Sequence, residues 1–180
     1  MHTIIQTQRI VIREFLSGEE NIYLSHFNDE LVTLYLPKRS KEERIDIFRK
    51  ALEKYKTDKK SGTWGMFNRA GGDFIGSCLL RPFNNEPGIL ELGYSMERKY
   101  WGAGIATEMA IAMVAYGFSG KNTSEIVAVT VLENLGSQRV LEKAGFKRMD
   151  NLLRDGEELA FFKIENASPN PLQRIGLQNV

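Results

Sequence analysis

The chain has 180 residues, of which 42% are hydrophobic and 26% charged, so it is long enough to bury one core and too apolar to be disordered. Lys and Arg number 24 against 23 Asp and Glu, a balance that excludes general nucleic-acid binding, which depends on a basic excess. The single cysteine, Cys78, rules out an internal disulfide or a cysteine-based metal site and favours a reducing compartment.

The N-terminal residues show no charged lead followed by a long apolar stretch, so we expect no secretory signal. The longest largely apolar run, 105–118, contains Thr107 and Glu108 and is too short to span a bilayer. These observations predict a cytoplasmic protein without membrane contact.

The first half of the chain begins with a predicted strand at 9–15, where apolar and charged residues alternate. Residues 19–36 predict two short helical segments that end at Pro37. Ser40 and Glu43 have the spacing of a capping box and predict the start of a longer helix. Its apolar residues share one face: Ile45, Phe48, Leu52 and Tyr55.

The middle of the chain alternates with a period of two, which is typical of strands. We expect strands at 63–68 and 74–83, joined by a glycine-containing turn, and a further strand at 89–96 after the turn 84–88. Consecutive strands with such short connections predict antiparallel pairing.

The second half predicts a helix at 105–118, a strand at 125–132 and a short helix at 136–144. Two strands follow at 147–152 and 157–164, joined by a hairpin turn. This order predicts a mixed α/β (α+β) fold rather than a doubly wound sheet. We expect one domain over 1–166 and a loose C-terminal extension over 167–180.

Two glycines, Gly102 and Gly104, stand directly before the helix at 105–118. Glycine permits positive φ and close approach to the backbone, and the first amides of a helix attract anions. The turn is therefore a candidate phosphate cradle, although a tight strand-to-helix connection would have the same sequence. It is no P-loop, and a dinucleotide fingerprint would require a third small residue where Thr107 stands.

Two segments, YSMERKYWGAGIATEMA at 94–110 and VLENLGSQRVLEKAGFKR at 131–148, resemble the central motifs of the GNAT superfamily of N-acetyltransferases. More narrowly, they resemble the RimJ/RimL-type branch, which contains the ribosomal-protein N-terminal acetyltransferases. In the family pattern Gln/Arg-x-x-Gly-x-Gly/Ala, the last two marked positions are Gly104 and Ala106. Trp101 departs from the first marked position.

The resemblance implies a twisted, mostly antiparallel sheet, splayed between parallel strands at 89–96 and 125–132, with helices on both faces. It also implies acetyl-CoA as the co-substrate, without a metal. The implied CoA-binding residues are Tyr94, Ser95, Met96, Trp101, Gly102, Ala103, Gly104, Ile105, Ala106, Thr107, Asn134, Ser137 and Arg139. Asn134 has a second interpretation, because its position also suits the N-cap of the helix that follows.

Acetyl transfer requires a neutral amine, and at pH 7 roughly one α-amine in seven is neutral against about one lysine side chain in 2,500. Glu91 is the candidate general base, because strict alternation places it on the less apolar face of its strand. An ordinary ion pair with a neighbouring Arg or Lys is the alternative.

Many family members have a tyrosine that protonates the departing thiolate, and Leu141 occupies the matching position. In the resembled branch a serine is proposed to serve instead, which implies Ser137 as the second catalytic candidate. A serine in the first turn of a helix also needs no catalytic explanation. His2 and His26 are too isolated in the sequence to suggest a metal site or a catalytic triad.

The resemblance predicts an acetyl-CoA-dependent N-acetyltransferase that acts on a primary amine, either a protein N-terminus or a small molecule. The alternative is a catalytically weak acyl-CoA sensor or partner module of the same fold, which Leu141 keeps open. The sequence specifies neither the acceptor nor the choice between a monomer and a homodimer.

Overall fold

The computed structural model describes residues 2–58, 60–120 and 122–166, so the predicted extension 167–180 lies outside the described residues. The chain forms two compact units. The first contains the residues up to Leu80 together with Gly93–Ala106, and the second contains Arg81–Leu92 together with the residues from Thr107 onward. Strand β5 (Ile89–Met96) begins in the second unit and ends in the first, so the units share a strand.

The first unit is built on four antiparallel neighbours: β1 (Thr3–Gln6), β2 (Ile10–Arg13), β3 (Gly62–Asn68) and β4 (Phe74–Pro82), of which β4 continues two residues into the second unit. Strand β1 was missed by sequence analysis. It is a four-residue edge strand without a buried side chain, so it lacks the inward-facing apolar residues that mark a strand in a sequence.

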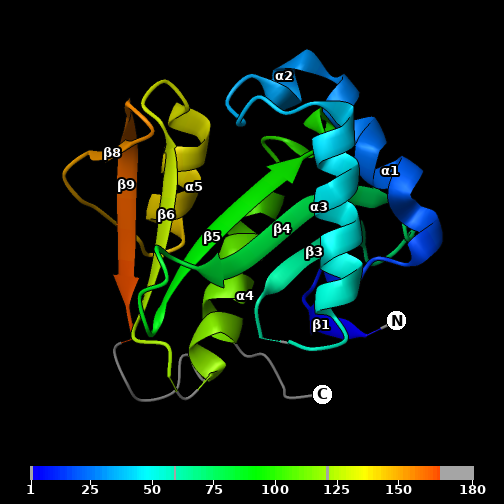
Figure 1. The fold of residues 1–180 in the computed structure, drawn as a ribbon, viewed down its shortest axis with the longest axis horizontal. Helices are drawn as coiled ribbons and strands as arrows, with labels where there is room; N and C mark the ends of the chain where they lie inside the picture. Colours follow the sequence, from blue (N-terminus) through cyan, green and yellow to red (C-terminus); the bar gives the residue numbers. More distant parts are fainter. Residues whose placement is uncertain (1, 59, 121, 167–180) are drawn as a thin grey trace. The chain divides into compact units, whose positions relative to one another are not determined.

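Helical segments connect β2 to β3 in the order that the sequence predicts. They are η1 (Ser17–Glu19), α1 (Glu20–Ser25), η2 (His26–Asn28), α2 (Glu30–Thr33) and α3 (Lys41–Lys54). The predicted capping box is confirmed: the Glu43 amide donates to Ser40 Oγ at 3.1 Å, and the Ser40 amide donates to Glu43 Oε2 at 2.6 Å. Helix α3 crosses in front of β3 in Figure 1.

An aromatic cluster fills the core of the first unit. Phe15 lies at its centre, with ring centroids 5.5 Å from Tyr23, 5.3 Å from Phe48 and 6.1 Å from Phe74. Edge-on and tilted contacts of this kind add to the free energy gained by burying the rings. The cluster therefore holds α1 and α3 against the strands of their unit.

The second unit contains the parallel pair and the pairings of β9 (Glu157–Glu165). The first residues of β5 pair in parallel with β6 (Glu125–Val131), at Ile89↔Glu125, Leu90↔Ile126 and Glu91↔Val127. Strand β6 pairs antiparallel with β9. The predicted mixed α/β fold, mostly antiparallel with one parallel pair, is confirmed.

The single strand predicted at 147–152 is wrong, because the structure has two short strands, β7 (Lys147–Arg148) and β8 (Leu152–Arg154). Both pair with β9, where Lys147 lies opposite Lys163 and Leu152 opposite Leu159. The chain advances five residues from Lys147 to Leu152, but only four along β9, from Lys163 to Leu159. One extra residue therefore interrupts the ladder, as in a β-bulge.

Two helices complete the description: α4 (Ile105–Ser119), which follows the glycine turn, and α5 (Leu135–Lys143). The Asn134 side chain caps α5 by accepting from the Ser137 amide at 3.1 Å, and Gly145 ends it with φ 95°. The predicted role of Asn134 as the N-cap of this helix is thereby confirmed. Its contact with CoA stays a prediction.

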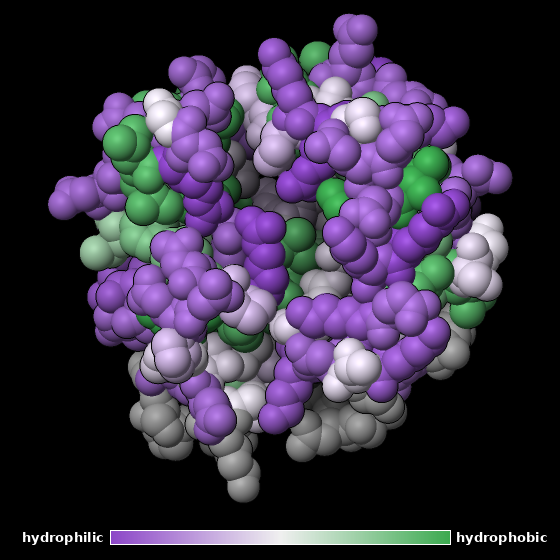
Figure 2. Space-filling view, in the orientation of Figure 1, coloured by the Kyte–Doolittle hydropathy of each residue, from purple (hydrophilic) through white to green (hydrophobic). Residues whose placement is uncertain are grey.

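The face seen in Figure 2 is largely hydrophilic, with apolar residues scattered over it. Within the described ranges, no helix has the length and apolar composition that crossing a membrane requires. Cys78 is buried in β4, and burial raises the pKa of its thiol.

Candidate functional site

The glycine turn lies between η3 (Arg98–Tyr100) and α4. Gly102 has φ 71° and Gly104 has φ 76°, a region that other residues adopt only with strain. A Cβ at Gly102 would meet no atom within 4 Å, so the backbone there is open to an approaching group. The turn thus needs glycine for its conformation as well as for access.

The amides of this turn are available to an anion. Among the described residues, the amides of Gly102, Ala103 and Gly104 donate in none of the backbone hydrogen bonds outside helices and strands. The first amides of α4, which follow directly, have no partner within the helix. A run of such N–H groups at the start of a 15-residue helix fits a diphosphate.

Two side chains hold the ends of the turn within the first unit. The Trp101 indole donates to the Met96 carbonyl at 2.9 Å and so fixes the turn to the end of β5. Arg9 Nη1 donates to the Ala103 carbonyl at 2.7 Å from a position 94 residues earlier in the chain. The departure of Trp101 from the family pattern therefore has a structural role.

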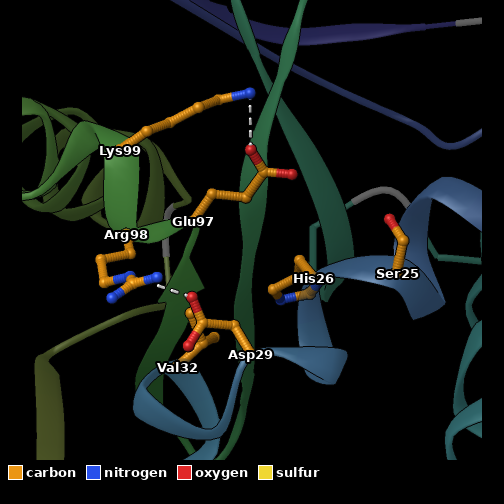
Figure 3. A pocket seen from close by; sticks show the side chains of 7 residues that line it. All are labelled: Ser25, His26, Asp29, Val32, Glu97, Arg98 and Lys99. Atoms are coloured by element: carbon orange, nitrogen blue, oxygen red, sulfur yellow. Dashed lines mark ion pairs between the residues drawn. The ribbon is translucent and has the colours of Figure 1, made fainter.

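A pocket of about 410 Å³ lies beside the segment that leads into the turn (Figure 3). Its lining residues come from α1, η2, α2 with the residue before it, and η3 with the residue before it: Ser25, His26, Asp29, Val32, Glu97, Arg98 and Lys99. Arg98 pairs with Asp29 at 3.1 Å, and Lys99 pairs with Glu97 at 2.8 Å. Both cations are largely exposed, so an incoming charged group can exchange with them.

His26 borders this pocket and bonds to β5. Its Nδ1 lies 2.8 Å from the Tyr23 carbonyl and therefore carries the proton, so Nε2 accepts from Ser95 Oγ at 2.8 Å. Ser77 Oγ lies 3.3 Å from Ser95 Oγ and extends the chain of hydrogen bonds. Although sequence analysis considered His26 isolated, the fold brings it to Ser95, a predicted CoA-binding residue.

Burial lowers the pKa of His26 to about 4 from an ordinary value of 6.5. Because the unfolded chain takes up this proton first, stability is full above pH 6.5 and is lost as the pH falls towards 4. We expect about 2 kcal/mol less unfolding free energy at pH 5 than at pH 7 from this residue. Urea unfolding at both pH values measures it, with His26→Gln as the control. An equal pH dependence in both proteins would contradict the assignment.

Glu91 is buried in the second unit, where two arginines contact its carboxylate. Arg154 Nη1 donates to Oε1 at 3.0 Å, while Arg81 Nη2 donates to Oε2 at 3.0 Å. The structure therefore contains the ion pairs that the alternative interpretation predicts. Both oxygens of the Glu91 carboxylate accept from guanidinium groups. Its role as a general base stays a prediction.

The predicted site residues divide between the units. The first unit contains 94–96 and 101–106, and within it the Trp101 indole donates to the Met96 carbonyl, while the Ala103 carbonyl accepts from Arg9. The second contains Glu91, Thr107, Asn134, Ser137 and Arg139, of which Asn134 and Ser137 are in contact. Leu141 is buried at 2% exposure and serves the core.

The sequence indicates neither the contact of Arg9 with the turn nor which arginines pair with Glu91. Arg9 alternates with apolar neighbours in 9–15, which predicts only an outward-facing polar residue. Arg81 and Arg154 lie 10 and 63 residues from Glu91. No local pattern in the sequence marks any of these contacts.

The fold and the glycine turn are those expected of a GNAT acetyltransferase, and comparisons with known proteins agree. The family described as "Acetyltransferase (GNAT) domain" matches residues 9–147. The chain therefore belongs to the GNAT acetyltransferase family, and the prediction of an N-acetyltransferase enzyme is confirmed.

One relative is the "Uncharacterized N-acetyltransferase YoaA" of Bacillus subtilis (strain 168), 28% identical over 151 residues, which cover 82% of this chain and 85% of the relative. Among solved structures, a RimL ribosomal L7/L12 alpha-N-protein acetyltransferase in complex with coenzyme A has a TM-score of 0.76 at 13% identity. The match covers 91% of this chain and 98% of that one.

The aminoglycoside acetyltransferase AAC(6')-Ib, in complex with coenzyme A, also has a TM-score of 0.76, at 14% identity and with coverages of 93% and 99%. At these identities the two structures show the fold alone.

Proposed function

We propose that this enzyme transfers an acetyl group from acetyl-CoA to a primary amine by direct attack of the amine on the thioester. The observation that carries the proposal is the glycine turn directly before α4. It has two positive φ angles, and, within the described part of the chain, Gly102, Ala103 and Gly104 donate in no backbone hydrogen bond outside helices and strands. CoA complexes of two structural neighbours support the same donor.

Acetyl-CoA supplies the thioester, and the chain has to bind its diphosphate and orient its acyl end. In the first unit, the amides at 102–106 are suited to the diphosphate, and the end of β5 with Tyr94, Ser95 and Met96 is proposed to line the pantetheine arm. In the second unit, Thr107, Asn134, Ser137 and Arg139 stay predicted contacts.

The acceptor is proposed to be an α-amine or a small primary amine. Of the two, an α-amine needs less help from a base, because a larger fraction of it is neutral at pH 7. Asp29 and Glu97 line the pocket of Figure 3, each paired with a largely exposed cation, so an acceptor ammonium can take the place of Arg98 or Lys99 there. The RimJ/RimL-type branch, the cytoplasmic location and the choice between a monomer and a homodimer remain predictions from the sequence.

We propose that Glu91 acts mainly through its ion pairs. Glu91→Gln leaves Arg154 and Arg81 without their partner, which is expected to lower the unfolding free energy by about 1–2 kcal/mol, since both arginines are partly exposed. The fall in kcat is expected to stay below about tenfold. Urea unfolding and steady-state kinetics measure the two effects.

Arg154→Met is the matched control, because it breaks one of the two ion pairs and keeps the carboxylate with Arg81. We expect Arg154→Met to lose stability, but less than Glu91→Gln. A fall of about 100-fold in the kcat of Glu91→Gln, with unchanged stability, would instead assign the general-base role to Glu91. Ser137 is proposed as the proton donor to the thiolate.

The proposed function is tested by calorimetry with acetyl-CoA and CoA, followed by a thiol-release screen across peptides and small amines. We expect micromolar binding of both ligands and acetylation of at least one amine class. Binding without turnover on any amine would favour the sensor module. The absence of binding at high micromolar ligand would contradict both functions.

A further inference from the structure

The Arg9 side chain reaches the glycine turn from the start of β2, within the first unit. Its Nη1 donates to the Ala103 carbonyl at 2.7 Å. Its Nη2 would lie 3.5 Å from a Cβ built on Gly104, which is ordinary contact distance. One guanidinium therefore covers two consecutive residues of the turn.

This contact determines the direction of one amide. In a planar trans peptide the C=O of one residue and the N–H of the next point to opposite sides. Because the Ala103 carbonyl points to Arg9, the Gly104 N–H points away from it. The guanidinium thus fixes this peptide group with a donor directed to the other side of the turn.

The base of the Arg9 side chain is itself held in place. The Arg9 carbonyl accepts from the Arg69 amide at 2.9 Å, next to the β3–β4 hairpin. Glycines lose more conformational freedom on ordering than other residues, so a turn with glycines at 102 and 104 benefits from an external contact before a ligand arrives.

We propose that Arg9 is a positioning residue that holds the glycine turn in its diphosphate-binding conformation. The inference rests on the proposed function, because it takes the diphosphate of CoA as the anion. Arg9 acts through the Ala103–Gly104 peptide, and the turn amides make the contact with the ligand.

The test compares Arg9→Met with Arg69→Met by calorimetry, using CoA and 3′-dephospho-CoA as probes. Arg69 is a matched control: it is exposed, has the same charge, and donates to the Thr7 carbonyl at 2.9 Å instead of to the turn. We expect Arg9→Met to lower the affinity for CoA and for 3′-dephospho-CoA by the same factor, about tenfold. Arg69→Met is expected to stay within about twofold of the wild type.

A second readout separates positioning from a general structural role. The kcat/KM of Arg9→Met is expected to fall for acetyl-CoA and to stay unchanged for acetyl-pantetheine, which lacks the diphosphate. Arg9→Lys, which keeps the charge and a donor, is expected to recover part of the affinity for CoA.

Three results would overturn the inference: wild-type affinity in Arg9→Met, equal losses in the two arginine variants, or a loss for CoA without a loss for 3′-dephospho-CoA. The last would indicate a direct contact with the 3′-phosphate. If the wild-type protein bound neither probe, the proposed function would fail, which is a distinguishable outcome.

Discussion

Replacing Gly104 by valine is expected to weaken CoA binding by more than about 100-fold and to leave the fold intact. Gly104 has φ 76°, which a β-branched residue adopts only at a substantial energetic cost. Valine would shift the turn towards an extended conformation and rotate the Gly104 N–H away from the diphosphate. Calorimetry with CoA measures the loss of affinity, and urea unfolding measures the stability.

Gly156→Val is the control for backbone strain. Gly156 lies in the hairpin between β8 and β9, has φ 82°, and has no atom within 4 Å of an added Cβ. The same strain is therefore introduced away from the glycine turn. We expect a similar loss of stability in both variants, with unchanged CoA binding in Gly156→Val. Equal CoA affinities in the two variants would remove the glycine turn from the proposed binding site.

Gly76→Ala is expected to cost about 4 kcal/mol or more of unfolding free energy. A Cβ at Gly76 would lie 2.2 Å from the Ser95 carbonyl oxygen and 2.8 Å from Met96 Cα. Both are backbone atoms of β5, so no side-chain rotation relieves the clash. The substitution would separate β4 from the part of β5 that precedes the turn, and urea unfolding measures the effect.

Gly93→Ala provides the comparison, since Gly93 lies in β5 and the nearest atoms to an added Cβ would be those of the Leu79 side chain, at 3.3 Å. Leu79 can shift by a few tenths of an ångström, so we expect a loss of about 1 kcal/mol. If Gly76→Ala cost no more than Gly93→Ala, the close approach of β4 and β5 at Gly76 would be wrong.

The elements whose causes are local could be predicted from the sequence. Ser40 and Glu43 are three residues apart, and their reciprocal bonds begin α3 at the next residue, as predicted. Asn134 and Gly145 similarly mark both ends of α5. Strand β5 was predicted with its observed bounds, because alternation and the preceding turn agree there.

The elements that depend on distant neighbours could not be predicted. Strand β1 exists because β2 offers it an edge, and the interruption between β7 and β8 depends on their register against β9. Neither feature has a signal in its own residues. A prediction from alternation alone therefore gave one continuous strand at 147–152 and did not include β1.

The candidate site shows the same division. The glycine turn was predicted because its conformation, with positive φ at two positions, requires glycine at a fixed spacing that is visible in the sequence. Its supporting contacts connect residues far apart: Arg9 to Ala103 over 94 positions, and His26 to Ser95 over 69. A single sequence contains no information on such pairs, so the role of Arg9 emerged only from the structure.

Cys78 has a practical consequence for the proposed screen. It is the only cysteine of the chain, it is 1% exposed, and its raised pKa keeps it as the unreactive thiol. A chromogenic aromatic disulfide added to the folded enzyme will therefore develop colour with released CoA and not with the protein. Turnover can be followed continuously with this reagent, without a cysteine-free variant.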